Sequence, residues 1–287
     1  MALAEFVYTV LLKAPPLRNL TNRALKAIIP AQFSVHEARV CLNPNDPVVA
    51  GALTLRVYER EEIDFFRTHF QPGMTFLDIG ANVGLYTALA LSLKAATVMA
   101  VEPHAESRSF LERTAQLNAQ HGANIFISPF AAAEEKKDLP LYENPDNKGD
   151  NRLYADALCI TKGMVHADKV DSICAEKNIH TVQFVKIDTQ GAEYGAIRGA
   201  AELLRNSPEC IIMSEFWPYG LRACGSDPAQ YLALLEELGF HLFELVGKNL
   251  IPVIHDNLIA KTSGRKYANI IGFKNKDGGT PSAILPA

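Results

Sequence analysis

The stretch that decides the fold is FLDIGANVGLYT, residues 76–87. An apolar run leads into Asp78, and a turn framed by Gly80 and Gly84 follows before a helix-like segment begins. Glycine lets the backbone turn sharply and approach a ligand closely, and the first N–H groups of a helix attract polar ligand groups. The stretch therefore predicts a strand–turn–helix unit that binds a nucleotide-like cofactor.

Strands and helices alternate on both sides of this unit. Short apolar strands are predicted, with helices of 12–17 residues between most of them. The strands are 74–79, 97–102, 124–129, 181–188, 209–216, 241–246 and 268–274, and the helices are 83–94, 105–121, 191–205 and 228–239. Strands this apolar suit a sheet that is buried on both faces. The pattern predicts an α/β fold with a Rossmann-like, doubly wound sheet.

The chain divides into three parts by pattern. Residues 1–50 form an N-terminal extension, with helices expected at about 3–13 and 17–28 and a strand at 32–42. Residues 51–275 contain the alternating units and form the main domain. Residues 276–287 are expected to be a flexible tail.

Composition narrows the class of protein. Apolar residues make up 48% of the chain and charged residues 21%, and the net charge is −4. This is not the basic footprint of a nucleic-acid binder. The five cysteines lack CxxC spacing, which argues against a disulfide framework or a zinc site and fits a reducing compartment. The apolar N-terminal stretch is too short to span a bilayer, so we expect a cytoplasmic protein without an integral membrane segment.

Four acidic residues occupy the expected ends of buried strands: Asp78, Glu102, Asp188 and Glu215. Ligands of open α/β sheets bind beyond the carboxyl ends of the strands. Acidic residues also cap helices, so a single one of them would carry little weight. Four together predict a shared cleft.

The residues at these strand ends distinguish between S-adenosylmethionine and NAD as the cofactor. A dinucleotide fingerprint would place glycine where Asn82 stands, and Asp78 would repel a pyrophosphate. Glu102, about 20 residues after Gly80, can accept both hydroxyls of a ribose. S-Adenosylmethionine carries a sulfonium and an ammonium and no phosphate, so the acidic strand ends favour it over NAD. An NAD-dependent oxidoreductase remains the alternative at this point.

The sequence resembles the FkbM-type family of S-adenosylmethionine-dependent methyltransferases. The resemblance runs from about Val57 to Trp217 and rests on the blocks YEREEIDFF, FLDIGANVGLYT, VEPHAESRSFLERTAQLN, VKIDTQGAEYGAIRGA and IIMSEF. It implies a class I methyltransferase fold for residues 51–275, with seven strands of which the last is antiparallel. It also implies methyl transfer to oxygen, commonly on a hydroxyl of a sugar, glycan or secondary metabolite.

The resemblance carries over to cofactor residues. It implies that the methionine-side loop contains Asp78, Gly80, Ala81, Asn82 and Gly84, and that Glu102 binds the ribose. Phe130 and Ala131 are expected to form an apolar wall for the adenine.

Three acidic residues are candidates for catalysis. Asp188 is the first, because it ends a central strand beside the expected donor and could orient the acceptor or take its proton. Glu193 and Glu215 follow, although Glu193 could merely favour a helix dipole and Glu215 could merely cap a turn. Gln190 stands where the family often has Glu, which puts in doubt a mechanism that needs a carboxylate there. A noncatalytic cofactor-binding protein is therefore a further alternative.

The polar segment ENPDNKGDNRLYADA, residues 143–157, suits an acceptor-binding loop. Asn151, Arg152 and Tyr154 are expected to contact the substrate together with Gln190. The expected partner is a small-molecule or glycan acceptor, not a nucleic acid, and a homodimer stays open. A divalent metal held by Asp188, Glu193 and Glu215 is conceivable. No spacing requires such an ion, and we expect none.

Overall fold

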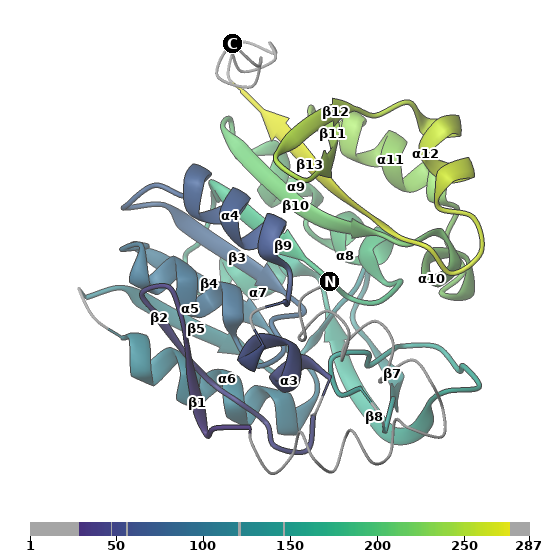
Figure 1. Cartoon of the computed structure of the whole chain (residues 1–287). Helices are drawn as coiled ribbons and strands as arrows, with labels where there is room; N and C mark the ends of the chain where they lie inside the picture. The colour runs from purple at the N-terminus through teal and green to yellow at the C-terminus, as the bar shows by residue number, and fades with distance from the viewer. Residues whose placement is uncertain (1–28, 47, 56, 120–121, 146, 276–287) are drawn as a thin grey trace.

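The computed structural model describes residues 29–275 apart from residues 47, 56, 120, 121 and 146. Its centre is a twisted sheet whose eight strands lie in the order β12-β11-β13-β10-β9-β3-β4-β5. Helices cover both faces of this sheet (Figure 1). The strands are β3 (Thr75–Ile79), β4 (Thr97–Val101), β5 (Asn124–Ser128), β9 (Phe184–Ile187), β10 (Cys210–Phe216), β11 (His241–Val246), β12 (Asn249–Pro252) and β13 (Ala268–Lys274). The predicted Rossmann-like α/β fold is confirmed.

The direction of the strands follows the class I methyltransferase pattern. Strands β10, β9, β3, β4 and β5 pair in parallel, whereas β13 pairs antiparallel with both β10 and β11. The antiparallel last strand is thus confirmed. The expected number of seven strands is wrong, because β12 adds an eighth at the edge. Gly247 and Lys248 form the two-residue turn of the β11–β12 hairpin, and Gly247 has the positive φ of 63° that such turns favour.

The helices divide between the two faces of the sheet. One face carries α4 (Arg60–His69), α5 (Leu85–Ser92) and α6 (Ala105–Asn118). The other carries α7 (Val170–Ala175), α8 (Glu193–Gly199), α9 (Ala201–Arg205) and α11 (Pro228–Glu237), with α12 (His255–Lys261) against α11. The single helix predicted for residues 191–205 is two helices, which meet at Ala200.

The core under α4 is aromatic. Phe66 packs edge-on against Phe76 of β3 and Phe184 of β9, with ring centroids 5.2 and 4.7 Å away. All three side chains are fully buried. Such pairs contribute about 0.5–1.5 kcal/mol each beyond the area they bury. This packing fixes the two central strands that end at the candidate site.

The described part of the N-terminal extension is joined to the α/β domain. Residues 32–42 form a hairpin of β1 (Gln32–Val35) and β2 (Ala38–Cys41), not the single strand expected, because His36 turns the chain at a φ of 52°. β2 packs on α6, where the Asn118 side chain accepts a hydrogen bond from the Arg39 backbone N–H at 2.9 Å. A short helix, α3 (Val49–Thr54), follows. The helices expected at 3–13 and 17–28, and the tail 276–287, lie outside the described residues.

A small second sheet stands beside the carboxyl ends of the main strands. It consists of β6 (Ala131–Ala132), β8 (Ile160–Asp168) and β7 (Lys137–Glu143), in that order. The polar segment 144–159 connects β7 to β8 and lies near α3 in Figure 1. Within the described part of the chain, no helix is both long enough and apolar enough to cross a bilayer.

Candidate functional site

The glycine turn after β3 passes directly over the end of β9. Gly80 has a φ of 81°, and a Cβ on it would stand 1.9 Å from the backbone oxygen of Asp188. Gly84 has a φ of 86° and lies against Leu111 of α6, where a Cβ would come within 2.7 Å of the leucine side chain. Both positions therefore require glycine, for conformation and for space. The turn lies close to its neighbouring elements on both sides.

Three of the four acidic residues form one row across the strand ends. The sheet register places Ile79, Val101, Ile187 and Ser214 side by side, so the residues that follow them lie level. Those residues are Gly80, Glu102, Asp188 and Glu215. Asp78 does not belong to this row: in the sheet register it lies opposite Lys186, before the strand ends. Asp78 is buried, accepts a hydrogen bond from the Thr87 hydroxyl at 2.7 Å, and has its pKa raised by burial to about 6.

Glu102 holds the glycine turn from the side of β4. Its two carboxylate oxygens accept hydrogen bonds from the backbone N–H groups of Asn82 at 2.9 Å and His104 at 2.8 Å. Burial raises the pKa of Glu102 to about 7 even though these N–H groups and Arg108 oppose the shift. Each oxygen still has a lone pair for a ligand hydroxyl. The alternative that Glu102 caps α6 is wrong, because the His104 side chain caps that helix.

Three adjoining cavities open at this row of residues. The loop cavity lies between the glycine turn and the second sheet, and it is lined by Gly80, Asn82, Glu102, Ala131, Ala132, Leu141, Lys148, Asn151, Leu153 and Gln190, among others. The lysine cavity lies on the α4–α5 side of the turn, among Tyr58, Glu59, Asp78, Gly80, Asn82, Tyr86 and Lys186. The outer cavity, of about 480 Å³, is lined by residues that include Glu59, Arg152, Gln190, Glu215, Trp217, Arg265 and Tyr267. Asp188 and Gly149 line all three.

Gln190 joins two of the catalytic candidates. Its side-chain amide donates to Asp188 Oδ1 at 2.6 Å and to Glu215 Oε2 at 3.2 Å. Burial, followed by the nearby charges of Asp188 and Glu193, raises the pKa of Glu215 well above its usual range. A carboxylate at position 190 would place a third negative charge here. The Gln190 amide instead bridges Asp188 and Glu215, so glutamine at this position is compatible with a catalytic site.

Lys186 is a site residue that the sequence analysis did not single out. It lies in the middle of β9 and is 5% exposed. Its ammonium lies 3.6 Å from Asp188 Oδ2 and 5.4 Å from the centroid of the Tyr86 ring. The signal was available, because a lysine is the one charged residue within the apolar run VQFVKI. Lysines are rarely buried unless they are paired.

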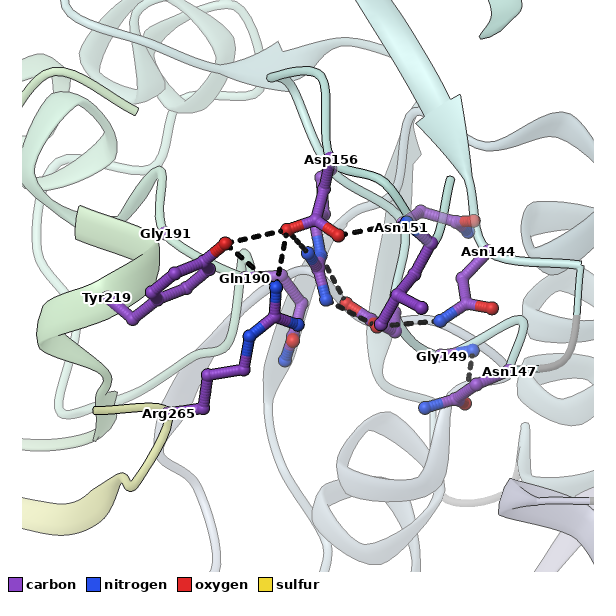
Figure 2. A network of polar contacts seen from close by, with 12 residues as sticks. Asn144, Asn147, Gly149, Asn151, Asp156, Gln190, Gly191, Tyr219 and Arg265 are labelled. Atoms are coloured by element: carbon purple, nitrogen blue, oxygen red, sulfur yellow. Dashed lines mark hydrogen bonds and ion pairs between the residues drawn. The ribbon is translucent and has the colours of Figure 1, made fainter. Parts of the chain in front are cut away.

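The segment after β7 contacts residues that follow β10 and residues that precede β13. Figure 2 shows Asp156 in contact with Tyr219 and Arg265, which come from α10 (Pro218–Ala223) and from the connection before β13. Asp156 Oδ2 accepts hydrogen bonds from the Tyr219 hydroxyl at 3.0 Å and from Arg265 at 3.3 Å. Arg152 is buried and pairs with Asp156 at 2.8 Å and with Asp150 at 2.6 Å. Asp150, Arg152 and Arg265 of this group line the outer cavity.

Some of the remaining predicted residues line a cavity and others do not. Ala131 and Asn151 line the loop cavity, and Arg152 and Gln190 line the outer cavity, as expected of ligand contacts. Phe130 packs against the core and Tyr154 is buried; neither is among the residues that line the three cavities. The cofactor role of Phe130 and the substrate role of Tyr154 therefore find no support in this geometry. Ala132, Leu141 and Leu153 line the loop cavity without having been predicted.

Glu193 is not among the residues that line the three cavities. It is 1% exposed, and its oxygens accept hydrogen bonds from the backbone N–H groups of Thr189 at 2.9 Å and Gly191 at 3.0 Å. It thereby closes the turn that leads from β9 into α8. A side chain held in this way supports the alternative reading, in which Glu193 stabilises a helix start, and not a catalytic role.

His104, Glu106 and Glu143 form the one group of potential metal ligands among the described residues. Lys148 and Lys162 both form ion pairs with Glu143. Although burial opposes the shift, these lysines lower the pKa of Glu143 to about 2. Two ammonium groups already balance the charge, so the group has the character of an ion-pair cluster.

Comparisons with known proteins give one family match and several similar folds. Residues 78–242 match the family model described as the methyltransferase FkbM domain. No curated protein sequence matches the chain. Among solved structures, a methyltransferase FkbM from Methylobacillus flagellatus is 13% identical with a TM-score of 0.45, and the match covers 92% of this chain and 60% of that one.

Two further solved structures are similar. A putative SAM-dependent methyltransferase from Streptococcus mutans is 14% identical with a TM-score of 0.44, over 85% of this chain and 56% of that one. A TehB-like SAM-dependent methyltransferase from Corynebacterium glutamicum is 12% identical with a TM-score of 0.42, and the match covers 78% of this chain and 93% of that one. The chain thus spans about 60% and 56% of the length of the first two.

Proposed function

This chain belongs to the FkbM methyltransferase domain family, and from that premise we propose that it methylates a hydroxyl oxygen of a sugar, glycan or secondary metabolite. The family is one of S-adenosylmethionine-dependent methyltransferases, so the nicotinamide-dependent alternative is not retained. One observation carries the proposal. Asp188 lines the two cavities beside the glycine turn and also the outer cavity, so a single carboxylate serves both a donor side and an acceptor side.

The residues around the glycine turn fit S-adenosylmethionine. The side-chain oxygens of Asn82 and Asn151 are buried in the wall of the loop cavity and have no hydrogen-bond partner among the described residues, as expected of groups that serve a ligand. Glu102 would hold the ribose hydroxyls, and Ala131 and Leu141 would flank the adenine. When bound, the cofactor supplies a methyl carbon activated by a sulfonium, which an oxygen attacks in line.

The outer cavity has the character of a hydroxyl-binding site. Trp217 offers an aromatic surface for the apolar face of a sugar, while Arg265 and Glu215 offer polar contacts. Correct placement of an acceptor beside the donor can contribute on the order of 7–11 kcal/mol to the rate. The acidic walls near Asp188 disfavour an acceptor that carries a phosphate or carboxylate next to the reacting hydroxyl.

Asp188 and Glu215 take different roles in this proposal. Asp188 lies beside the Lys186 ammonium and lines the outer cavity, so its carboxylate can accept the proton of the acceptor hydroxyl. Burial raises the pKa of Glu215 well above its usual range, and in its protonated form this group can donate a hydrogen bond to the acceptor. Gln190 holds the two side chains in place. Proton transfer of this kind contributes about 10²–10⁴-fold.

The test is a screen for methyl transfer. The protein is incubated with S-adenosylmethionine and a panel of neutral, amino and acidic sugars and phenolic or polyol metabolites. S-Adenosylhomocysteine release and a mass increase of one methyl group are recorded. Asp188→Asn is run beside the wild type. Methylation of nitrogen only, or cofactor binding without transfer to any acceptor class, counts against the proposal; the second result favours the noncatalytic alternative.

A further inference from the structure

Lys186 lies in a cavity whose other charged groups are acidic. Among the described residues lining the lysine cavity, Glu59, Asp78 and Asp188 carry carboxyl groups, and Lys186 provides the one ammonium. The lysine enters this cavity from the central strand β9, beneath the glycine turn. A buried charge is costly unless it is paired. The lysine is therefore expected to have anionic partners at this position.

The acidic neighbours of Lys186 are mostly bound to other groups. Asp78 accepts from Thr87 at 2.7 Å, and Glu59 accepts from the Tyr86 hydroxyl at 2.7 Å. Within the part of the chain that the structure describes, the ammonium forms one ion pair, with Asp188 at 3.6 Å. An ammonium has three donors. Lys186 therefore has N–H donors left for a ligand in the lysine cavity.

The acidic neighbours of Lys186 favour the charged form of its ammonium. Burial alone would lower the pKa of Lys186, but the charges of Asp188, Glu59 and Glu215 raise it above its usual range. A cation on a cavity wall attracts an anion. The ligand group that it would suit best is a carboxylate, because charge-assisted N–H···O bonds are the strong ones.

The position of the cavity identifies which carboxylate this is. Gly80 and Asn82 line both the loop cavity and the lysine cavity, so one ligand can pass over the turn with an end in each. With the ribose held at Glu102, the amino-acid end of the donor would enter the lysine cavity. That end carries an ammonium and a carboxylate next to the sulfonium. Two cations and one anion in the donor thus face several carboxyl groups and one ammonium in the protein.

We propose that Lys186 binds the carboxylate of the methionine moiety of S-adenosylmethionine, with Glu59, Asp78 and Asp188 facing the ammonium and the sulfonium. This inference rests on the proposed function only through the cofactor, because it concerns donor binding and not transfer. Lys186 is thereby a cofactor-binding residue, and it does not act as the base. Its contact with Asp188 links the donor subsite to the candidate base.

The test compares two ligands that differ by the carboxylate alone. Isothermal titration is performed with S-adenosylmethionine and with decarboxylated S-adenosylmethionine, on wild type and Lys186→Met. Wild type is expected to bind the decarboxylated ligand roughly 10- to 100-fold more weakly. Lys186→Met is expected to bind S-adenosylmethionine more weakly by a similar factor and to bind both ligands with nearly equal affinity.

A matched control is Lys148→Met. Lys148 lines the loop cavity and pairs with Glu143, but it is not among the lining residues of the lysine cavity. This variant is expected to keep the full preference for the carboxylate. If both lysine variants lose it equally, long-range charge is responsible and the assignment of Lys186 is overturned.

Other outcomes are also decisive. Equal binding of the two ligands by wild type, or equal weakening of both ligands in Lys186→Met, would show that Lys186 only balances the surrounding acids. If Lys186→Met does not fold, Lys186→Gln is titrated, and the wild-type ligand comparison still decides whether the carboxylate is bound. If wild type binds both ligands with the expected preference but methylates no acceptor, the proposed function fails while this inference stands.

Discussion

Gly80 and Asp188 lie in direct backbone contact: a Cβ on residue 80 would stand 1.9 Å from the Asp188 carbonyl oxygen. The contact joins the turn after β3 to the turn after β9. It therefore sets the distance between the expected donor loop and the expected base. Since the obstacle is a backbone atom, no side-chain rotation can relieve it.

Gly80→Ala is expected to weaken binding of S-adenosylhomocysteine at least tenfold and to lower the melting temperature. The left-handed conformation costs a non-glycine residue about 1–2 kcal/mol, and the collision adds to that. Gly73→Ala is the matched control, because Gly73 has a φ of 86° and nothing within 4 Å of a Cβ. Equal effects of the two substitutions in calorimetry and thermal melting would mean that strain alone, and not contact with Asp188, requires Gly80.

Binding of S-adenosylhomocysteine is expected to weaken as the pH falls from 8 to 6.5. The pKa of Glu102 is raised to about 7, and its ionised form is the better acceptor for ribose hydroxyls. Loss of the ionised form over this interval weakens binding by up to about fourfold. Glu102→Gln should bind more weakly at pH 8 and show little pH dependence. A wild-type titration series that is flat in pH would exclude the ribose role of ionised Glu102.

Asp188→Asn should separate transfer from donor binding. We expect the transfer rate to fall by about 10²–10⁴-fold, as is typical for loss of a general base. Affinity for S-adenosylhomocysteine should change by less than about tenfold, because the amide keeps a hydrogen-bonding side chain in place. Rates are measured in single-turnover experiments on an acceptor found by the screen.

Glu193→Gln serves as the comparison for Asp188→Asn. Its carboxylate accepts backbone hydrogen bonds from Thr189 and Gly191, so substitution should cost stability, by about 1–2 kcal/mol, and leave the transfer rate nearly intact. Denaturant unfolding measures the loss of stability, and the single-turnover assay measures the transfer rate. A large loss of rate in a stably folded Glu193→Gln protein would restore Glu193 as a catalytic candidate.

Gln190→Glu should make stability fall as the pH rises. The new carboxyl group would lie beside Asp188 and Glu215, so its folded-state pKa is raised above the unfolded value near 4.3. The folded state then binds more protons than the unfolded state, and the free energy of unfolding decreases between about pH 4 and the raised pKa. We expect a loss of about 1–2 kcal/mol at pH 8 relative to pH 5, measured by urea unfolding. Gln190→Ala removes the bridge without adding charge and should lack this pH dependence.

The fold could be predicted largely because its signals are local. The strand β3, the glycine turn and α5 follow from one continuous stretch, and the parallel sheet follows from the alternation of strands and helices. The eighth strand β12 was missed because NLIP has little apolar pattern and pairs only at an edge. The β1–β2 hairpin was missed because its turn uses His36 and Glu37 in place of the usual glycine or asparagine.

The site was predictable where a residue type and a strand end coincide. Glu102, Asp188 and Glu215 lie in one row as expected, because parallel strands end together. Lys186 was overlooked because it precedes the strand end and lies within an apolar run that is typical of the core. Glu193 could not be separated from a catalytic acid in the sequence, since its role depends on which N–H groups the loop turns toward it. Only the folded loop shows that its oxygens are already occupied.

The contact of Asp156 with Tyr219 and Arg265 has a consequence for how such enzymes diversify. The three residues come from connections after β7, after β10 and before β13, and none belongs to the glycine turn. Insertions or exchanges in these connections can reshape the outer cavity while the donor row of Gly80, Glu102 and Asp188 stays in place. Acceptor range and donor chemistry can thus be inherited separately, so a relative with the same glycine turn need not share this chain's acceptor.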